Sequence, residues 1–288
     1  MANRLPIVRD VATLRQRVAE LRATERAEIG LVPTMGALHQ GHMALVRAAR
    51  DSGARPVATL FVNPKQFERP DDLDIYPRGE AEDAAMLAAE GCALLFAPEV
   101  SEIYPGGFST SIHVGGISEP MEGASRPGHF QGVATVVAKL LLQCLPDRAY
   151  FGEKDFQQLQ TVRRMVRDLD IPVEIVGVET VREPDGLALS SRNRNLTQTQ
   201  RMIAPALAQV LFEAAERLSE GVAAAPVLAR GKQRLLEAGF HRVDYLELRE
   251  AATLAPLERV NERPARLLTA AWLGHTRLID NVAVVSRS

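Results

Sequence analysis

Apolar residues along the chain follow two alternating patterns, short continuous runs and longer stretches at helical spacing. Val11, Leu14, Val18 and Leu21 follow the helical spacing after Asp10, which is a suitable N-cap. We predict further helices in residues 79–90, 133–145 and 156–169 and after residue 42. Short apolar runs predict strands in residues 29–32, 57–62, 93–96, 149–151 and 173–178. This order predicts an α/β fold, a Rossmann-like and mainly parallel sheet with helices on both faces.

The pattern changes after about residue 179. A Pro-Asp-Gly turn between short extended runs predicts a hairpin in residues 180–190, and Thr197 with Gln200 has capping-box spacing before one long helix through residue 218. We predict a second helix in residues 228–238 and strands in residues 243–248, 266–272 and 277–285. The chain is therefore expected to contain a Rossmann-like domain in residues 1–180 and a smaller α+β domain in residues 181–288.

Composition and charge limit the classes of function. The chain has 288 residues, 46% of them hydrophobic, and its 34 basic and 36 acidic side chains leave a formal net charge of −2. Because a nearly neutral protein has no overall field to attract polyanions, we expect neither nucleic acid nor a membrane as a partner. Cys92 and Cys144 lie outside any Cys-x-x-Cys pair, so reduced, buried thiols are expected. The sequence shows no signal-peptide or membrane-spanning apolar run, which predicts a cytoplasmic location.

The segment from Val32 to His42 is the most informative motif, because it joins an apolar run to a helix through glycines and two histidines. Backbone N–H groups at a helix N-terminus favour an anion, and Gly36 and Gly41 permit a sharp turn or a close approach to a ligand. An ordinary loop and a metal pair are the alternatives for His39 and His42, but the His-Glu-x-x-His pattern of zinc proteases is absent. We favour binding of a nucleotide's phosphates.

Two further polar segments are suited to phosphate. In residues 151–155, Lys154 offers a point charge, and Asp155 can cap a helix or accept from ribose hydroxyls. A solvated turn is the alternative, but the expected place at the carboxyl edge of the sheet favours phosphate binding. In residues 189–193, two serine hydroxyls and the guanidinium of Arg192 form a compact oxyanion clamp, with a polar loop as the alternative. At the expected domain junction, this clamp is placed to act as a lid.

A fourth segment, residues 61–67, follows the second predicted strand. Asn63 and Gln66 supply neutral donors and acceptors beside aromatic residues, which suits a small hydroxylated acid better than a metal ion. Taken alone, the segment is equally compatible with an ordinary strand-exit loop. The same neutral polarity recurs at Gln157 and Gln158. The signatures of P-loop, dinucleotide-binding and esterase sites are missing from the sequence.

Taken together and in order, these segments resemble one known family. The resemblance rests on PTMGALHQGH in residues 33–42, FVNP in 61–64, QF in 66–67, YPR in 76–78, RPGHF in 126–130, FGEKD in 151–155, LSSRN in 189–193, AWLG in 271–274 and LIDN in 278–281. Over this chain-wide set the sequence is similar to the pantothenate synthetase family, of the nucleotidylyltransferase superfamily. The resemblance implies an ATP-dependent ligase. Pantoate attacks the α-phosphorus of ATP and releases pyrophosphate, and β-alanine then displaces AMP from pantoyl adenylate to give pantothenate, a step towards coenzyme A.

The resemblance also implies residue roles, transferred by matching position. His39 and His42 donate to phosphate oxygens, with His42 as the proton donor, and Lys154 and Arg192 complete the catalytic set. The implied ATP site comprises Pro33, Thr34, Met35, Gly36, Ala37, Leu38, His39, Gln40, Gly41, His42, Gly152, Glu153, Lys154, Asp155, Val181, Leu189, Ser190, Ser191 and Arg192. The implied site for pantoate and β-alanine comprises Phe61, Asn63, Gln66 and Gln158. The first domain would then bind nucleotide and pantoate, and the second would act as a lid.

The family further implies Mg²⁺ with ATP, held chiefly by phosphates and water rather than by a protein metal site, and a homodimer. Lys65 stands where the family usually carries Met, and because neighbours on an extended segment point to opposite sides, we expect its side chain outside the pocket. Two alternatives stay open. Another nucleotidylyltransferase or adenylate-forming enzyme should lack the pair of Gln66 and Gln158. A non-catalytic nucleotide-binding module would gain nothing from two histidines together with Lys154 and Arg192.

Overall fold

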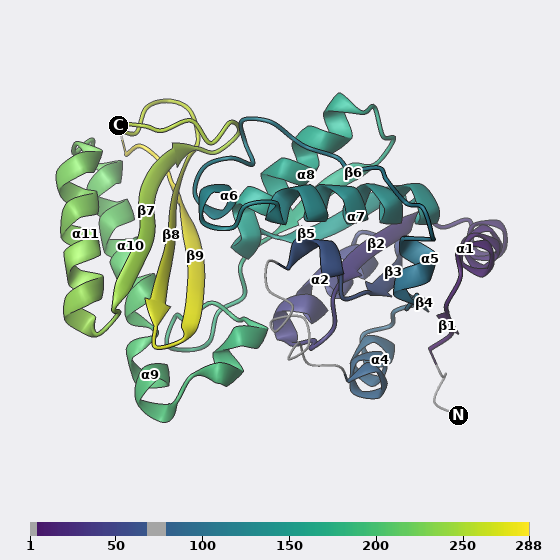
Figure 1. Ribbon diagram of the computed structural model, residues 1–288. Helices are drawn as coiled ribbons and strands as arrows, with labels where there is room; N and C mark the ends of the chain where they lie inside the picture. The colour runs from purple at the N-terminus through teal and green to yellow at the C-terminus, as the bar shows by residue number, and fades with distance from the viewer. Residues whose placement is uncertain (1–4, 68–78, 288) are drawn as a thin grey trace. The chain divides into compact units, whose positions relative to one another are not determined.

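The computed structural model describes residues 5–67 and 79–287 of the chain, so the YPR motif in residues 76–78 lies outside the described residues. The chain divides into two compact units (Figure 1). The first comprises Met1–Glu153 and Thr161–Glu179, and the second comprises Lys154–Gln160 and Thr180–Ser288. The division of function expected at residue 180, between a binding domain and a lid, stays a prediction.

The first unit contains a six-stranded sheet in the order β1-β4-β3-β2-β5-β6, with parallel pairing throughout. The strands are β1 (Ile7–Val8), β2 (Ile29–Thr34), β3 (Arg55–Leu60), β4 (Leu94–Phe96), β5 (Arg148–Gly152) and β6 (Glu174–Val178). The parallel α/β fold is therefore confirmed, and β1 is an addition to it. From β2 the chain builds outward through β3 to β4, then returns to β5 on the other side of β2. Ligands of open α/β sheets bind at such a switch point, beyond the carboxyl ends of the strands.

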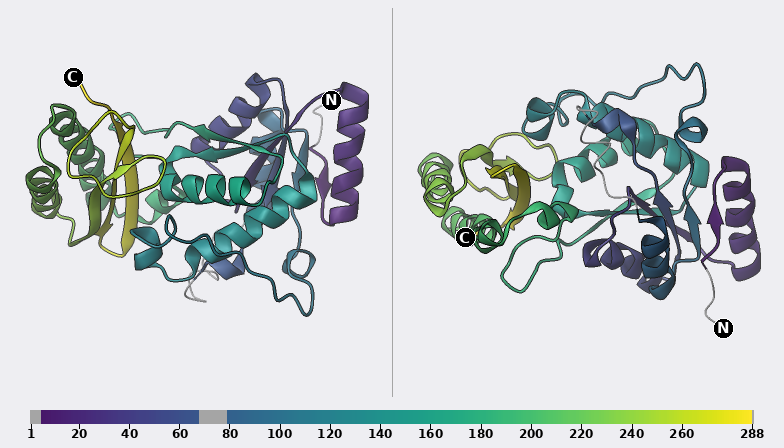
Figure 2. Two further views of the ribbon diagram at one scale, coloured as in Figure 1. Left: turned by 90° about the horizontal axis from the view of Figure 1, so that it is seen from above. Right: turned by 60° about the horizontal axis from the view of Figure 1, so that its bottom comes forward.

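Helices cover both faces of this sheet (Figure 2). The helices of this part of the chain are α1 (Val11–Glu25), α2 (Gln40–Asp51), α4 (Glu80–Ala89), α5 (Val100–Ile103), α6 (Glu122–Ser125), α7 (His129–Cys144) and α8 (Phe156–Asp168). Asp10 is the N-cap of α1, as expected, and its carboxylate accepts from Thr13 N at 2.8 Å. The helix expected in residues 133–145 begins earlier, at His129, after Gly128 in the left-handed conformation.

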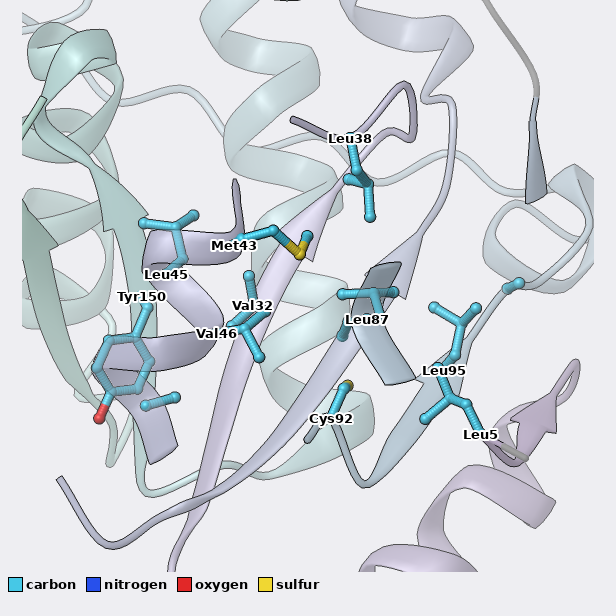
Figure 3. Close-up of a cluster of buried hydrophobic side chains, with 13 residues drawn as sticks. Leu5, Val32, Leu38, Met43, Leu45, Val46, Leu87, Cys92, Leu95 and Tyr150 are labelled. Atoms are coloured by element: carbon cyan, nitrogen blue, oxygen red, sulfur yellow. The ribbon is translucent and has the colours of Figure 1, made fainter. Parts of the chain in front are cut away.

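Side chains on both faces of the sheet are buried. Val32 and Ala58 pair across β2 and β3 and belong to a core with side chains of α2 and α4, including Met43 (Figure 3). The adjacent pair, Leu31 and Val57, is equally buried. Because successive side chains of a strand point to opposite faces, this second pair faces the other side, where α7 packs on β2. Burial on both faces explains why the strands read as continuous apolar runs.

The second unit is built on a three-stranded antiparallel sheet, in the order β7-β8-β9. Its elements are α9 (Gln198–Ile203), α10 (Ala206–Ser219), α11 (Ala224–Ala238), β7 (Arg242–Glu250), β8 (Ala265–Leu273) and β9 (Thr276–Val284). Helices α10 and α11 lie side by side against the sheet (Figures 1 and 2). The smaller α+β fold is thus confirmed. Among the described residues, no helix has the length and apolar character to cross a membrane.

Two local expectations for this unit are met only in part. The capping box of Thr197 and Gln200 is present, but the single helix expected through residue 218 is divided into α9 and α10 at Pro205. Proline has no N–H to donate to the preceding turn and instead stands directly before α10. The hairpin expected in residues 180–190 is a loop with one antiparallel bridge, between Arg182 and Ala188, and is too short to form strands.

Candidate active site

The turn after β2 places His42 in the first turn of α2, as the sequence motif predicts, and the helix has a histidine cap. His39 is the N-cap residue; its Nδ1 accepts from Gly41 N at 3.1 Å, and Nδ1 of His42 accepts from His39 N at 3.3 Å. The two imidazole rings lie 4.2 Å apart between centroids. A neutral imidazole that accepts through Nδ1 carries its proton on Nε2. The cap therefore presents two Nε2–H donors at a helix N-terminus, where the dipole favours an anion.

Asp83 of α4 holds this turn, and sequence reasoning missed it. Gly36 and Ala37 have φ angles of +91° and +52°, a left-handed conformation that is strained for alanine. Asp83 is 4% exposed, and its carboxylate accepts from Ala37 N at 3.0 Å and from Leu38 N at 2.9 Å. These charge-assisted bonds stabilise the strained turn. Nothing in the sequence distinguishes Asp83 from the other acidic residues of α4.

The segment after β3 forms a short 3-10 turn, Pro64–Gln66, around the buried amide of Asn63. Asn63 is 1% exposed; its Nδ2 donates to Gln66 Oε1 at 3.0 Å and to Gly132 O at 3.1 Å, and its Oδ1 accepts from the Tyr104 hydroxyl at 2.8 Å. Burial raises the pKa of that hydroxyl, so it stays a donor. Gln66 in turn donates from Nε2 to Met35 Sδ at 3.1 Å. Side chains from the segments after β2 and β3 thus meet, with Asn63 placed to orient Gln66.

The outward orientation expected for Lys65 is confirmed. The Lys65 side chain is exposed, and its Nζ lies 5.0 Å from the ring centroids of Tyr104 and Phe108, a cation–π arrangement at the surface. Phe61 is 4% exposed and lies 6.1 Å from Tyr104 between ring centroids. The Lys65 side chain therefore makes its contacts with Tyr104 and Phe108, whereas the amide of Gln66 contacts Asn63 and Met35.

In the second unit, one cavity brings together the two remaining segments suited to phosphate. Its lining comprises Lys154, Leu187, Ala188, Ser190, Arg192, Asn193, Leu207, Arg277, Leu278, Ile279 and Asp280. Lys154 has a side chain 15% exposed, with Nζ 3.6 Å from Asp155 Oδ1. The Oγ of Ser190 accepts from Arg192 N at 3.3 Å and caps a 3-10 turn, Ser191–Asn195. An ammonium, a guanidinium and a hydroxyl are groups that bind anions in proteins, and the carboxylate of Asp280 in the same lining is paired with Arg182. Arg277, which sequence reasoning missed, also lines the cavity, and its Nε donates to Asp244 Oδ2 at 2.7 Å.

A buried ion pair fixes the loop that leads to Ser190. Arg182 Nη1 and Nη2 donate to the two carboxylate oxygens of Asp280 at 2.6 and 2.9 Å, and the two side chains are 18% and 2% exposed. Val181 O accepts from Leu189 N at 2.9 Å, so these two residues of the implied ATP site lie opposite each other at the base of this loop. Paired and hydrogen-bonded in this way, the buried charges hold the loop in one geometry.

The structure therefore groups the predicted residues within each unit. In the first, His39, His42, Met35 and Gln66 come from adjacent segments at the carboxyl ends of β2 and β3, and Gly152 ends β5, the other neighbour of β2. The chain continues through Glu153 into the second unit, where Lys154 joins the cavity described above. No group of three His, Cys, Asp or Glu side chains in residues 5–67 and 79–287 is arranged to hold a metal ion.

A parallel sheet whose central strand leads into a histidine-capped helix defines a nucleotide-binding α/β protein. Comparison with known proteins gives the particular family. The family model for pantoate-beta-alanine ligase matches residues 6–283. A pantothenate synthetase from Chelativorans sp. (strain BNC1) is 57% identical over 280 residues, which cover 97% of this chain and 98% of that protein. One from Paramagnetospirillum magneticum (strain AMB-1) is 55% identical over 284 residues, 99% of each chain.

Solved structures agree. Pantothenate synthetase from Thermus thermophilus is 49% identical and superposes with a TM-score of 0.90, over 98% of this chain and 100% of that chain. The pantoate-beta-alanine ligase of Francisella tularensis, solved with β-γ ATP and β-alanine, is 33% identical with a TM-score of 0.79, over 96% and 97% of the two chains. This chain belongs to the pantoate-beta-alanine ligase family and is a ligase, as the sequence motifs indicate.

Proposed function

We propose that the protein condenses (R)-pantoate with β-alanine to pantothenate, using ATP and passing through pantoyl adenylate. The observation that carries the proposal is the histidine cap of α2, in which Nδ1 of His39 and Nδ1 of His42 each accept a backbone N–H, in a chain that belongs to this ligase family. A family member from Francisella tularensis binds β-γ ATP and β-alanine, the nucleotide and the amine that the reaction requires.

In the first step, a carboxylate oxygen of pantoate attacks the α-phosphorus, and the bond from that phosphorus to the bridging oxygen of pyrophosphate breaks. Negative charge then grows on the leaving phosphates. His39 and His42 donate hydrogen bonds from Nε2 to those oxygens, and the proton-donor role implied for His42 is this hydrogen bond, because a neutral imidazole keeps its Nε2 proton. Fixed donors of this kind contribute roughly 10²- to 10³-fold each to a rate. Pro33 to Gly41 supply the backbone that lines the nucleotide.

Lys154, Ser190, Ser191 and Arg192 hold the triphosphate in this proposal. Three of them line one cavity, and the side chain of Lys154 is mostly buried, which strengthens the attraction of its charge for an anion. Positioning and fixed positive charge supply most of the catalysis in nucleotidyl transfer. The segments around Val181 and Leu189 and around Gly152, Glu153 and Asp155 would contact the adenosine.

Gln66 and Gln158 would bind the hydroxyl and carboxylate groups of pantoate, beside the ring of Phe61. Asn63 would act through Gln66, because both of its amide hydrogens are already bonded within the protein. In the second step, the β-alanine amine attacks the acyl carbonyl carbon, and the bond to the AMP oxygen breaks. A closed pocket would protect the mixed anhydride from water meanwhile.

We also propose that Mg²⁺ enters with ATP and that the protein is a cytoplasmic homodimer. The described residues offer no cluster of three ligating side chains, so phosphate oxygens and water would supply most of the metal's ligands. The ion would neutralise charge on the phosphates. Lys154 and Arg192 would then meet a nucleotide of lower net charge.

One assay tests the proposal. Purified protein is incubated with ATP, Mg²⁺ and pantoate, and pyrophosphate and pantoyl adenylate are followed with and without β-alanine. We expect about one pyrophosphate per site without the amine and continued turnover to pantothenate and AMP with it. EDTA should stop both phases. Pyrophosphate release that does not depend on pantoate would favour a different nucleotidylyltransferase, and no adenylate and no pantothenate would reject the proposal.

A further inference from the structure

Asn281 of β9 lies in the LIDN motif, which has no part in the mechanism above. Its side chain is buried, with 3% of the residue exposed. Nδ2 donates to the backbone oxygen of Lys154 at 2.9 Å, and Oδ1 accepts from Arg266 Nε at 2.6 Å. Only an amide side chain can donate at one end and accept at the other in this way. Asn281 therefore joins the main chain at Lys154 to the C-terminal sheet.

Arg266 of β8 holds the same segment at a second point. Its guanidinium carbon lies 4.3 Å from the centroid of the Phe156 ring, and the residue is 9% exposed. The contact is a buried cation–π interaction two residues beyond Lys154. These contacts account for why Lys154–Gln160 belongs to the unit of β7, β8 and β9, although it follows β5 directly in the chain.

The neighbouring residue of β9 fixes the other cationic segment. Asp280 accepts from Arg182 on the loop that leads to Ser190, and its Oδ1 also accepts from Asn281 N at 2.7 Å. Adjacent positions on one strand thus hold both segments whose side chains line the cavity with Lys154 and Arg192. Asn281 itself supplies position and not charge.

We propose that Asn281 is a positioning residue for Lys154 in adenylation; the inference rests on the proposed role of Lys154 in holding the triphosphate. The lysine side chain is long and flexible, so its ammonium is placed reproducibly only if the main chain that carries it is fixed. Asp155 is a competing partner, with its Oδ1 3.6 Å from the ammonium. A displaced Lys154 main chain would let the ammonium turn towards that carboxylate instead of the phosphates.

The sharpest variant is Asn281→Asp, which keeps the shape of the side chain and the acceptor for Arg266. It replaces the Nδ2 donor that faces Lys154 O by an oxygen, so this hydrogen bond, here called the tether, is lost and two acceptors oppose each other. We expect kcat/KM for ATP in adenylate formation to fall roughly 10- to 100-fold, the effect of misplacing one catalytic group by about 1 Å. Thr269→Val is the matched control. It removes a buried hydroxyl of the same sheet, which donates to Tyr245 O at 2.9 Å. It should lower the thermal midpoint while leaving kcat/KM within about twofold, a margin set by the small reach of a local packing change.

A double-mutant cycle with Lys154→Ala separates the inference from the proposed function. If Asn281 acts through Lys154, Asn281→Asp should cost less than about threefold once the ammonium is gone, because the two effects share one path. An equal loss of kcat/KM with Lys154 present and with Lys154→Ala would overturn the inference and leave the role of Lys154 intact. So would a loss in Asn281→Asp no larger than that in Thr269→Val. Full activity of Lys154→Ala would overturn the role of Lys154 and the inference with it. If circular dichroism shows that Asn281→Asp does not fold, Asn281→Ser, which removes the tether without adding charge, carries the same expectation.

Discussion

Replacing Asp83 by Asn removes the negative charge that holds the histidine turn while keeping the size of the side chain. In the protein, each carboxylate oxygen accepts one backbone N–H, from Ala37 at 3.0 Å and from Leu38 at 2.9 Å. An amide keeps one acceptor and places an NH₂ group against the other N–H. One bond is therefore lost, the other loses its charge assistance, and a donor is left facing a donor in a site that is 4% exposed.

The expected size of this effect follows from those contacts. A hydrogen bond to a buried charged group contributes about 1.5–3 kcal/mol, and a buried unsatisfied donor costs about 1–3 kcal/mol. Since the substitution weakens both bonds without creating a cavity, we expect a loss of about 2–4 kcal/mol in the free energy of unfolding. For a folding unit of this size, that corresponds to a fall of roughly 4 to 15 °C in the thermal midpoint.

The same change should reduce catalysis, because the turn carries His39 and His42. We expect kcat for pyrophosphate release to fall by about 100-fold, as for a displacement near 1 Å. The assay is pantoate-dependent pyrophosphate release beside a thermal melt, with Glu82→Gln as the control that removes a neighbouring, exposed carboxylate of α4. If Asp83→Asn matched that control in both melting and turnover, the carboxylate would not be what holds the turn.

Three further predictions concern other sites. His42→Ala should abolish adenylate formation with the circular dichroism spectrum retained, since it removes a phosphate donor and a cap worth about 1 kcal/mol; unchanged turnover would refute the assigned role. Burial raises the pKa of Cys92 to about 11 and that of Cys144 to about 12, so neither thiol should react with a disulfide reagent at pH 8 until urea is added, and fast native labelling would contradict this. Burial opposes ionisation of Asp147, but hydrogen bonds from Arg22 and a backbone amide outweigh it and hold its pKa below the ordinary 3.8. Its stabilising effect is therefore present above pH 3.8 and lost as the pH falls through the lower folded-state pKa. Urea titrations should show that Asp147→Asn lowers the free energy of unfolding at pH 7 and reduces its fall at acidic pH. Parallel curves of the free energy of unfolding against pH for the two proteins would contradict this.

Periodicity located the parallel sheet because its strands are continuous apolar runs buried on both faces. It missed β1, since two residues show no period, and it ran one helix across Pro205 because apolar spacing continues on both sides of the proline. The hairpin before Ser190 was expected from its turn residues alone. A single antiparallel bridge forms there, and the ion pair of Arg182 with Asp280 holds the loop in addition to its few backbone hydrogen bonds.

For the candidate site, the position of His42 near a helix N-terminus followed from local sequence, since a strand, a glycine turn and a helix succeed one another within a few residues. The supporting side chains did not. Asp83, Tyr104 and Asn281 act on partners between 41 and 127 positions away along the chain, and two of the three bond to backbone atoms that any residue would present. Such partners leave no pattern in a single sequence, so only the folded structure could identify them.

The discontinuity of the second unit has a practical consequence for engineering. A gene fragment beginning at Thr180 would encode α10, α11 and the whole antiparallel sheet, but not Lys154–Gln160. Arg266 and Asn281 would then lose the ring and the carbonyl that they contact in the intact chain. Exchange of this unit between relatives as a single cassette would therefore mismatch these contacts, and a working chimera has to transplant two stretches of sequence together.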